Sequence, residues 1–137
     1  MADMDCIIGK WKMVSSENFD DYMKALGVGI VLRNLANVAT PTIEFSKGDD
    51  DTWTMTTSAT FRTVEIKFKL NEEFEEVTGD GRKCATTFSF ENGVLTQKQV
   101  GKDGSKNSEL IRTFKGDDLT TVLKVDDVVC TRVYKKV

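Results

Sequence analysis

Residues 64–70 read VEIKFKL, and the four apolar side chains of this run alternate with Glu65, Lys67 and Lys69. Successive side chains of a β-strand point to opposite faces of the sheet, so one face of this run is predicted to be buried and the other hydrated. Such alternation is typical of an antiparallel sheet that packs against a core on one side. The pattern therefore predicts a strand over Val64–Leu70.

The same texture extends outward from this run, from Thr42 to the end of the chain. Short segments rich in Val, Ile, Thr and Phe are separated by turn residues. The turns are expected at Lys47–Asp50, Gly79–Gly81, Glu91–Gly93, Asp103–Gly104 and Lys115–Asp118. About ten strands result, and an open sheet of that size would expose its edges. We therefore predict an all-β fold, a ten-stranded antiparallel β-barrel of the β-clam type.

Two helical runs precede these strands. The first is predicted to begin at Asn18, whose side chain can accept a hydrogen bond from a first-turn amide, and to end at Gly27. The second covers Ile30–Val38, and Pro41 closes the segment. Together they predict a helix-turn-helix lid at about residues 18–38 that caps one open end of the barrel. The pair carries few basic residues, so it is not expected to bind DNA.

Composition bounds the class of protein. The chain has 137 residues, of which 39% are hydrophobic and 30% charged, and this suits a single domain over residues 1–137. The formal net charge of -3 creates no general attraction for nucleic acid. No apolar run is long enough to span a bilayer, and the acidic start Met1–Asp5 lacks the basic segment of a secretion signal. We expect a cytoplasmic protein with no nucleic-acid partner.

Residue types for metal binding and catalysis are sparse. Cys6, Cys84 and Cys130 are widely spaced and form no C-x-x-C pair, which is typical of a reducing compartment. The chain contains no histidine, so a zinc site is disfavoured. A G-x-S-x-G nucleophile elbow is also missing. We expect no metal, no cofactor and no enzymatic activity, with a cysteine or carboxylate isomerase as the alternative.

Two arginines interrupt the apolar pattern of the last strands. Arg112 shares a face with Leu110 and Phe114, so it is predicted to point into the barrel. Arg132 shares a face with Tyr134, but both faces of the last strand carry apolar residues, and parity leaves its direction open.

An arginine inside a barrel keeps its charge, and burying it unpaired costs several kcal/mol. If Arg112 and Arg132 both point inward from neighbouring strands, with the phenol of Tyr134 beside them, they form a donor cluster that fits a carboxylate. The alternatives are that Arg112 or Arg132 faces solvent, or that it pairs with a glutamate inside the barrel.

Three groups of motifs carry a family resemblance. They are GKWK at 9–12 with SENFD at 16–20 and YMKALGVG at 22–29, the segment FKL to EFEE at 68–76 with DGRK at 80–83, and VCTRVY at 129–134. In this order and spacing, the chain resembles the intracellular lipid-binding proteins, the family of fatty-acid-binding and cellular retinoid-binding proteins. The N-terminal third is most similar to the myelin P2, heart and brain group. The resemblance implies the ten-stranded β-clam with a helical lid.

The resemblance also implies a ligand and its contacts. The ligand would be a long-chain fatty acid or a similar hydrophobic monocarboxylate, transported in the cytoplasm. Arg132 and Tyr134 would hold the carboxylate directly, and Arg112 would hold it through ordered water. The remaining implied cavity residues contact the tail or line the water-filled part of the cavity: Phe19, Met23, Pro41 and Phe61 for the tail, and Asp80 and Arg82 for the water.

Other segments favour a different ligand. FRTVEI at 61–66, DGRKC at 80–84 and DDVVC at 126–130 resemble the cellular retinoic-acid-binding branch. That branch also uses two arginines and a tyrosine, so retinoic acid stays the alternative ligand. A secreted lipocalin, whose G-x-W pattern fits residues 9–11, and a scaffold that presents the helix pair are further alternatives.

Ligand entry is expected between the second helix and the turns near Ser58 and Val77, with the helix pair as a mobile lid. Lys24 and Arg33 on this lid are candidates for transient contact with anionic membranes, and plain solvated surface is the alternative. We expect the protein to act as a monomer.

Overall fold

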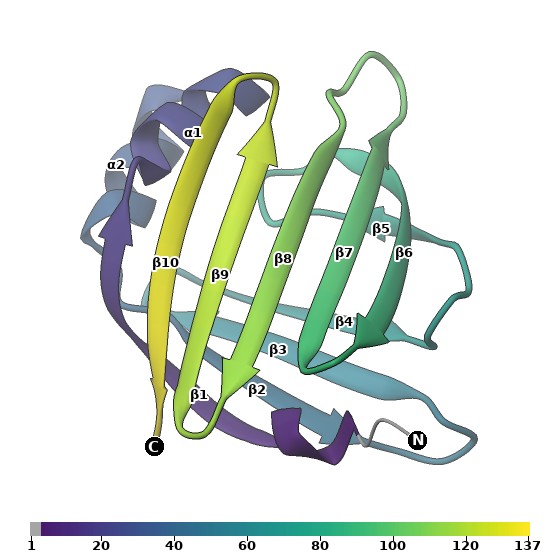
Figure 1. Cartoon of the computed structure of the whole chain (residues 1–137). Helices are drawn as coiled ribbons and strands as arrows, with labels where there is room; N and C mark the ends of the chain where they lie inside the picture. Colours follow the sequence, from purple (N-terminus) through teal and green to yellow (C-terminus); the bar gives the residue numbers. More distant parts are fainter. Residues whose placement is uncertain (1–3) are drawn as a thin grey trace.

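The computed structural model describes residues 4–137 and shows a β-barrel with two short helices at one end (Figure 1). Of the acidic start discussed above, Met1–Asp3 lies outside the described residues. The helices are η1 (Met4–Ile7, a 3-10 helix), α1 (Phe19–Leu26) and α2 (Ile30–Val38). The strands are β1 (Gly9–Glu17), β2 (Thr42–Lys47), β3 (Trp53–Ala59), β4 (Arg62–Phe68), β5 (Phe74–Val77), β6 (Lys83–Glu91), β7 (Val94–Gly101), β8 (Ser108–Lys115), β9 (Asp118–Val125) and β10 (Val128–Lys136).

The ten strands form one antiparallel sheet in the order β4-β3-β2-β1-β10-β9-β8-β7-β6-β5. β4 and β5 stand at the two ends of this order, so the barrel is nearly closed and its gap lies between them. β1 pairs with β2 on one side and with β10 on the other, with an irregularity between Met13 and Ser15. β1 thereby joins strands β2–β4 to strands β6–β10. In Figure 1, β2–β4 pass behind β6–β10. The predicted ten-stranded barrel is confirmed.

The strand predicted over Val64–Leu70 is shifted by two residues. Its alternation is correct, since Glu65 and Lys67 are exposed and Phe68 is buried. β4 ends at Phe68 because this residue pairs with Trp53, the first residue of its partner strand β3. β3 has no further residue that could pair with Lys69. Leu70 leaves the strand but still packs against the core.

The helix boundaries agree with the prediction, although the predicted cap does not. α2 covers Ile30–Val38 as expected, and α1 ends at Leu26, capped by Gly27, whose positive φ of 87° suits a residue without a side chain. Asn18 also has a positive φ, of 63°, and its side chain makes no capping hydrogen bond. It donates instead to the carbonyl of Val129 at 3.3 Å, so this side chain ties the start of α1 to β10.

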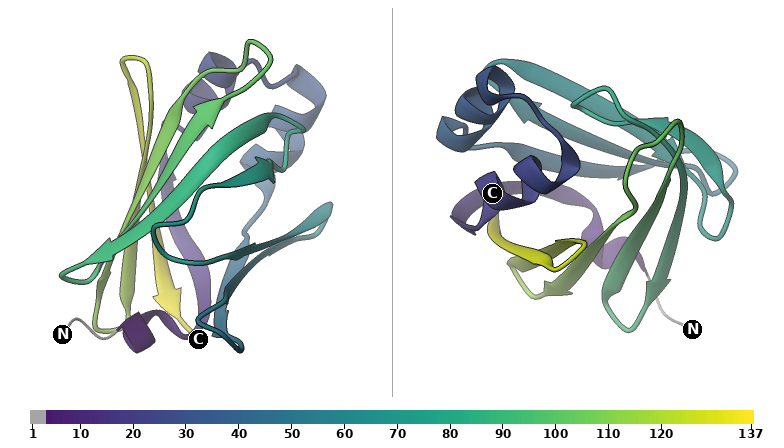
Figure 2. Two further views of the ribbon diagram at one scale, coloured as in Figure 1. Left: turned by 90° about the vertical axis from the view of Figure 1, so that its right-hand side faces the viewer. Right: turned by 90° about the horizontal axis from the view of Figure 1, so that it is seen from above.

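The barrel is packed solid at the end opposite the two helices. Trp11 is fully buried there, and its Nε1 donates a hydrogen bond to the carbonyl of Ile7 in η1 at 3.0 Å. The ring of Phe68 stacks on that of Phe88 with centroids 3.9 Å apart, and Phe114 packs edge-on against Trp11. α1 lies against β9 and β10 and beside α2, above the other end of the barrel (Figure 2). The hollow part of the molecule lies beneath these helices.

Candidate ligand-binding site

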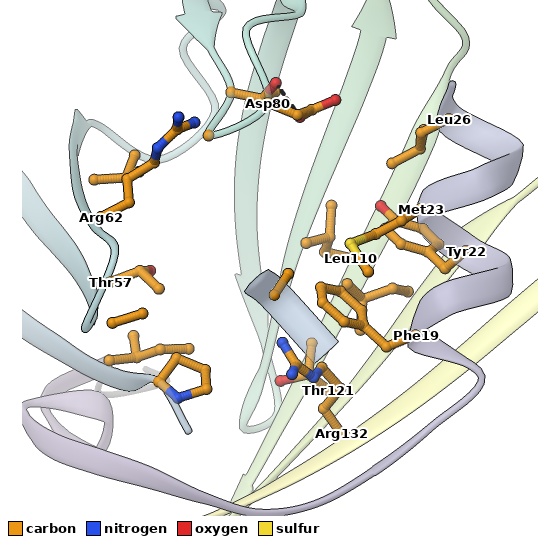
Figure 3. Close-up of a pocket in the computed structure, with 18 of the residues that line it drawn as sticks. Phe19, Tyr22, Met23, Leu26, Thr57, Arg62, Asp80, Leu110, Thr121 and Arg132 are labelled. Atoms are coloured by element: carbon orange, nitrogen blue, oxygen red, sulfur yellow. Dashed lines mark hydrogen bonds between the residues drawn. The ribbon is translucent and has the colours of Figure 1, made fainter. Parts of the chain in front are cut away.

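A cavity of about 280 Å³ lies between the two helices and the barrel wall. Figure 3 shows it with α1 on one side and β3 and β4 on the other. All nine residues predicted for the site line it, namely Phe19, Met23, Pro41, Phe61, Asp80, Arg82, Arg112, Arg132 and Tyr134. The structure thus brings the predicted residues together in one enclosure, and their individual roles stay predictions.

Arg132 points inward from β10 and is only 7% exposed, which resolves the direction that parity left open. Its Nε donates to Ser16 Oγ on β1 at 3.1 Å. Its guanidinium lies 3.7 Å from the centroid of the Phe19 ring on α1, in a cation–π contact. Figure 3 shows Phe19 directly beside this arginine. Arg132 is therefore held by β1 and by the lid at once.

Arg112 points inward from β8 and is 4% exposed, as its parity predicts. Its Nη1 donates to Gln97 Oε1 at 2.9 Å, and its Nε makes no hydrogen bond. Burial lowers the pKa of this guanidinium, and the nearby phenol of Tyr134 and the carboxylate of Glu76 oppose that lowering. The group remains a cation at neutral pH because an arginine pKa lies so far above it.

The prediction that the two arginines lie on neighbouring strands is wrong. β9 runs between β8 and β10, and Thr121 of β9 is the register partner of both Arg112 and Arg132. The three residues form a row across adjacent strands on the inner face of the barrel. Thr121 is 3% exposed, and its Oγ1 makes no hydrogen bond. A buried hydroxyl without a partner is costly, so this atom is poised to bond to whatever enters the row.

Tyr134 follows Arg132 by two residues along β10 and faces the same cavity. Burial raises the pKa of its phenol, while the charges of Arg132 and Arg112 lower it in part. The phenol therefore keeps its proton at neutral pH and can donate a hydrogen bond to an anion.

Asp80 and Arg82 form an ion pair in the turn between β5 and β6. Arg82 Nε donates to Asp80 Oδ2 at 2.7 Å, and Thr78 Oγ1 donates to Asp80 Oδ1 at 2.6 Å. Both side chains are mostly buried. Their charges cancel locally, so they supply a polar cavity wall without a net attraction for an anion.

The apolar part of the lining is larger than the sequence analysis predicted. Phe61 is 36% exposed and lies where the cavity meets solvent. Met23 is buried on the side of α1 that faces the cavity. The further apolar lining residues lie partly in the helical segment and partly on the inner faces of β2, β3, β4, β8 and β9, where they include Ile43, Met55, Val64, Ile66, Leu110 and Leu123. Strand parity alone could have found these positions. Parity could not show which of them border space and which fill the core.

The basic residues of the lid are bound within the lid. Asp20 Oδ1 accepts hydrogen bonds from Arg33 Nε at 3.2 Å and from Asn37 Nδ2 at 2.9 Å, and Asp20 Oδ2 pairs with Lys24 at 3.4 Å. Arg33 also donates to the carbonyl of Val28, and its side chain is 15% exposed. Arg33 is therefore not the exposed basic residue that the sequence analysis assumed. The exposed side chains of α2 are instead apolar or amide: Ile30, Val31, Leu35 and Val38 beside Asn34 and Asn37.

A β-barrel that keeps a lined cavity beneath two helices, with guanidinium groups inside, belongs to the class of lipid-binding barrel proteins. More narrowly, the chain belongs to the lipocalin/cytosolic fatty-acid binding protein family, whose model matches residues 8–137. This is a family of lipid-binding, not catalytic, proteins. No helix within residues 4–137 has both the length and the apolar character needed to cross a bilayer.

Three relatives illustrate the range of the family. The chain is 52% identical to the sodium/calcium exchanger regulatory protein 1 of Doryteuthis pealeii, over 96% of each chain. It is 42% identical to the cellular retinoic acid-binding protein 2 of Rattus norvegicus, over 92% of this chain and 94% of the relative. Among solved structures, it is 38% identical to a Schistosoma mansoni fatty acid binding protein in complex with arachidonic acid, over 99% of each chain, with a TM-score of 0.92.

Proposed function

We propose that the protein binds one long-chain fatty acid in this cavity and carries it through the cytoplasm, as a monomeric single domain over residues 1–137. One observation carries the proposal: Arg112 and Arg132 are both buried on the cavity wall, and their side-chain hydrogen bonds go to the neutral groups of Gln97 and Ser16. Neither arginine forms a direct ion pair among the described residues, and two buried cations outnumber the one buried carboxylate near them, Glu76, so the site favours an anionic ligand. The relative solved with arachidonic acid supports a fatty acid as that ligand.

The carboxylate would lie in the row formed by Arg112, Thr121 and Arg132. Arg132 and Tyr134 donate to it directly, and Arg112 acts through an ordered water. The free hydroxyl of Thr121, between the two arginines in register, adds a further donor. Charge-assisted hydrogen bonds of this kind are about twice as strong as neutral ones.

The acyl tail supplies most of the affinity. Burying a methylene is worth about 0.8 kcal/mol, so a long acyl chain gains on the order of 10 kcal/mol before ordering costs are subtracted. Phe19, Met23, Pro41 and Phe61 would contact this tail, because they line the apolar part of the cavity. The arginines then determine the orientation of the ligand and the preference for an acid.

Entry would occur beneath α2, past the turns that follow β3 and β5. Ala36 of α2, Ala59, Phe61 and Gly79 all line the same cavity, so a small movement of α2 opens it toward solvent. Transient membrane contact through the lid would use the exposed Ile30, Val31, Leu35 and Val38, since Arg33 is bound within the lid. Such a helix face suits insertion at a bilayer surface.

Retinoic acid is the second candidate ligand. The chain is 42% identical to a cellular retinoic acid-binding protein, and a cluster of two arginines and a tyrosine suits either acid. Titration with oleate, retinoic acid and retinol separates the two. Oleate is expected to bind most tightly. Tighter binding of retinoic acid would mean that retinoic acid, and not a fatty acid, is the ligand.

The same titration on Arg112→Ala and Arg132→Ala tests the carboxylate site. Each variant is expected to lose acid affinity by about 30-fold or more, the effect of truncating one partner of a buried charge pair, while some binding of the alcohol is retained. Equal loss of acid and alcohol binding would contradict a carboxylate role.

A separate experiment tests for enzymatic activity: a lipid is incubated with the protein and then analysed for chemical change. A carrier is expected to leave the lipid unchanged, and conversion of the lipid to a product would indicate an enzyme.

A further inference from the structure

Glu76 is a buried carboxylate that the fatty-acid proposal leaves unused. It lies on β5, its side chain faces the cavity, and it is 5% exposed. Its Oε1 accepts hydrogen bonds from Thr86 Oγ1 at 2.7 Å, Gln97 Nε2 at 2.9 Å and Gln99 Nε2 at 3.1 Å. Three hydrogen-bond donors therefore converge on one carboxylate oxygen of Glu76. Acidic side chains are rarely buried unless a partner justifies it.

The partner of Glu76 is Arg112, reached through Gln97. An arginine can only donate, so Gln97 must present its carbonyl oxygen to Arg112 and its amide nitrogen to Glu76. The hydrogen bonds therefore run in one direction, from Arg112 through Gln97 to Glu76. This arrangement couples the two charges and keeps the guanidinium free of a direct ion pair, with its Nε unbonded.

The polar end of the cavity consequently has a defined net charge. Among the described residues, the charged side chains that line the cavity are Arg62, Glu76, Asp80, Arg82, Arg112 and Arg132. Asp80 and Arg82 neutralise each other, and Arg62 is exposed, on the wall across the cavity from Arg132 (Figure 3). Two guanidinium groups and one carboxylate remain, so the net charge at this end is +1.

We propose that Glu76 sets the charge of the headgroup that the cavity accepts: one negative charge is matched, and a second is rejected. The inference rests on the proposed fatty-acid site and specifies it further. A carboxylate or sulfonate neutralises the excess positive charge. A doubly ionised phosphate monoester of the same chain length would leave one negative charge uncompensated in a buried site, beside the carboxylate of Glu76. Glu76 therefore acts by excluding the wrong headgroup more than by attracting the right one.

The test compares three ligands of equal chain length at pH 8, where the phosphate monoester is a dianion: palmitate, hexadecyl sulfonate and hexadecyl phosphate, all below the concentrations at which they aggregate. The proteins are the natural chain, Glu76→Gln and Glu75→Gln. The amide of Glu76→Gln keeps an oxygen that can accept hydrogen bonds from the same donors. Glu75→Gln removes the same formal charge one residue away, on the outer face of β5, where Glu75 pairs with Lys102 at 3.1 Å.

The natural chain is expected to prefer the sulfonate over the phosphate by about tenfold or more, and Glu76→Gln to reduce that preference by about tenfold. Glu75→Gln is expected to leave it unchanged. Equal preferences in Glu76→Gln and Glu75→Gln would overturn the role of Glu76 while leaving the fatty-acid site intact. Failure of the natural chain to bind any of the three ligands would refute the proposed function itself. If Glu76→Gln does not fold, the preference of the natural chain is itself the test. Equal affinity of the natural chain for the sulfonate and the phosphate would contradict the inference.

Discussion

The two ends of the barrel use the same strands for opposite purposes. On β8, Phe114 packs against Trp11 in the solid end, and Arg112, two residues earlier, lines the cavity. Both side chains point inward and both are buried. Strand alternation therefore sets only the direction of a side chain. Whether the interior is filled or hollow depends on which residue types face one another across it.

The difference separates stability from binding. In the solid end, aromatic rings stack at centroid distances such as 3.9 Å for Phe68 and Phe88. In the hollow end, buried polar atoms such as Thr121 Oγ1 and Arg112 Nε make no hydrogen bond, which costs folding free energy and leaves them available to a ligand. The solid end must compensate for that cost.

The largest expected effect belongs to the solid end. Phe88→Ala removes a fully buried ring that stacks on Phe68, so it should lower the free energy of unfolding by about 3–5 kcal/mol. Leu123→Ala, a truncation at the cavity, should cost less, because it removes a smaller side chain that already borders space. Denaturant unfolding measures both. Equal costs would show that the two ends are packed alike, and would break the comparison.

An intermediate effect is expected from Thr121→Val, which exchanges a hydroxyl for a methyl group of similar size. Affinity for oleate should fall by about tenfold or somewhat more, the value of one hydrogen bond to a charged group. The free energy of unfolding should stay constant or rise, because the variant removes a buried hydroxyl that has no partner. Thr120→Val, at the next position of β9 on the other face, is the control. A loss of stability without a loss of affinity would mean that Thr121 serves folding and not binding.

The smallest effect concerns the lid and its dependence on pH. The hydrogen bond from Asn37, followed by the interactions with Lys24 and Arg33, lowers the pKa of Asp20 below its ordinary value of 3.8. A group with a lowered folded-state pKa stabilises above the unfolded pKa and loses that contribution as the pH falls through the folded value. The link between α1 and α2 should therefore weaken only below about pH 4.

Amide hydrogen exchange in α1 and α2 measures this weakening. Asp20→Asn should show slightly faster exchange at neutral pH and no further acid-dependent step in the helices. Asp21→Asn, the adjacent acidic residue of α1, should behave like the natural chain. Identical exchange in all three proteins would show that Asp20 does not hold the lid.

Much of this architecture could be predicted from local patterns. The alternation of residues 64–70 and the turn residues predicted the barrel, and the apolar neighbours of Arg112 predicted its inward direction. The direction of Arg132 was ambiguous because both faces of β10 are apolar. The contacts of Arg132 with Ser16 of the paired strand β1 and with Phe19 of α1 show that it points inward.

The remaining features depend on contacts between strands, which a single sequence does not encode locally. Thr121 is an ordinary strand residue until the register places it between two arginines. Glu76 belongs to a run of acidic residues, and only the position of β5 next to β6 turns it inward toward Thr86 and Gln97. Asn18 has the residue type of a helix cap, but its left-handed backbone directs its side chain to Val129.

A crystal structure of the protein with bound oleate tests the central claim most directly. The carboxylate is predicted to lie within hydrogen-bond distance of Arg132 and Tyr134, next to Thr121, with the tail running past Met23 toward Phe61. A carboxylate at the mouth of the cavity near Arg62, with the tail pointing at the buried arginines, would contradict the account.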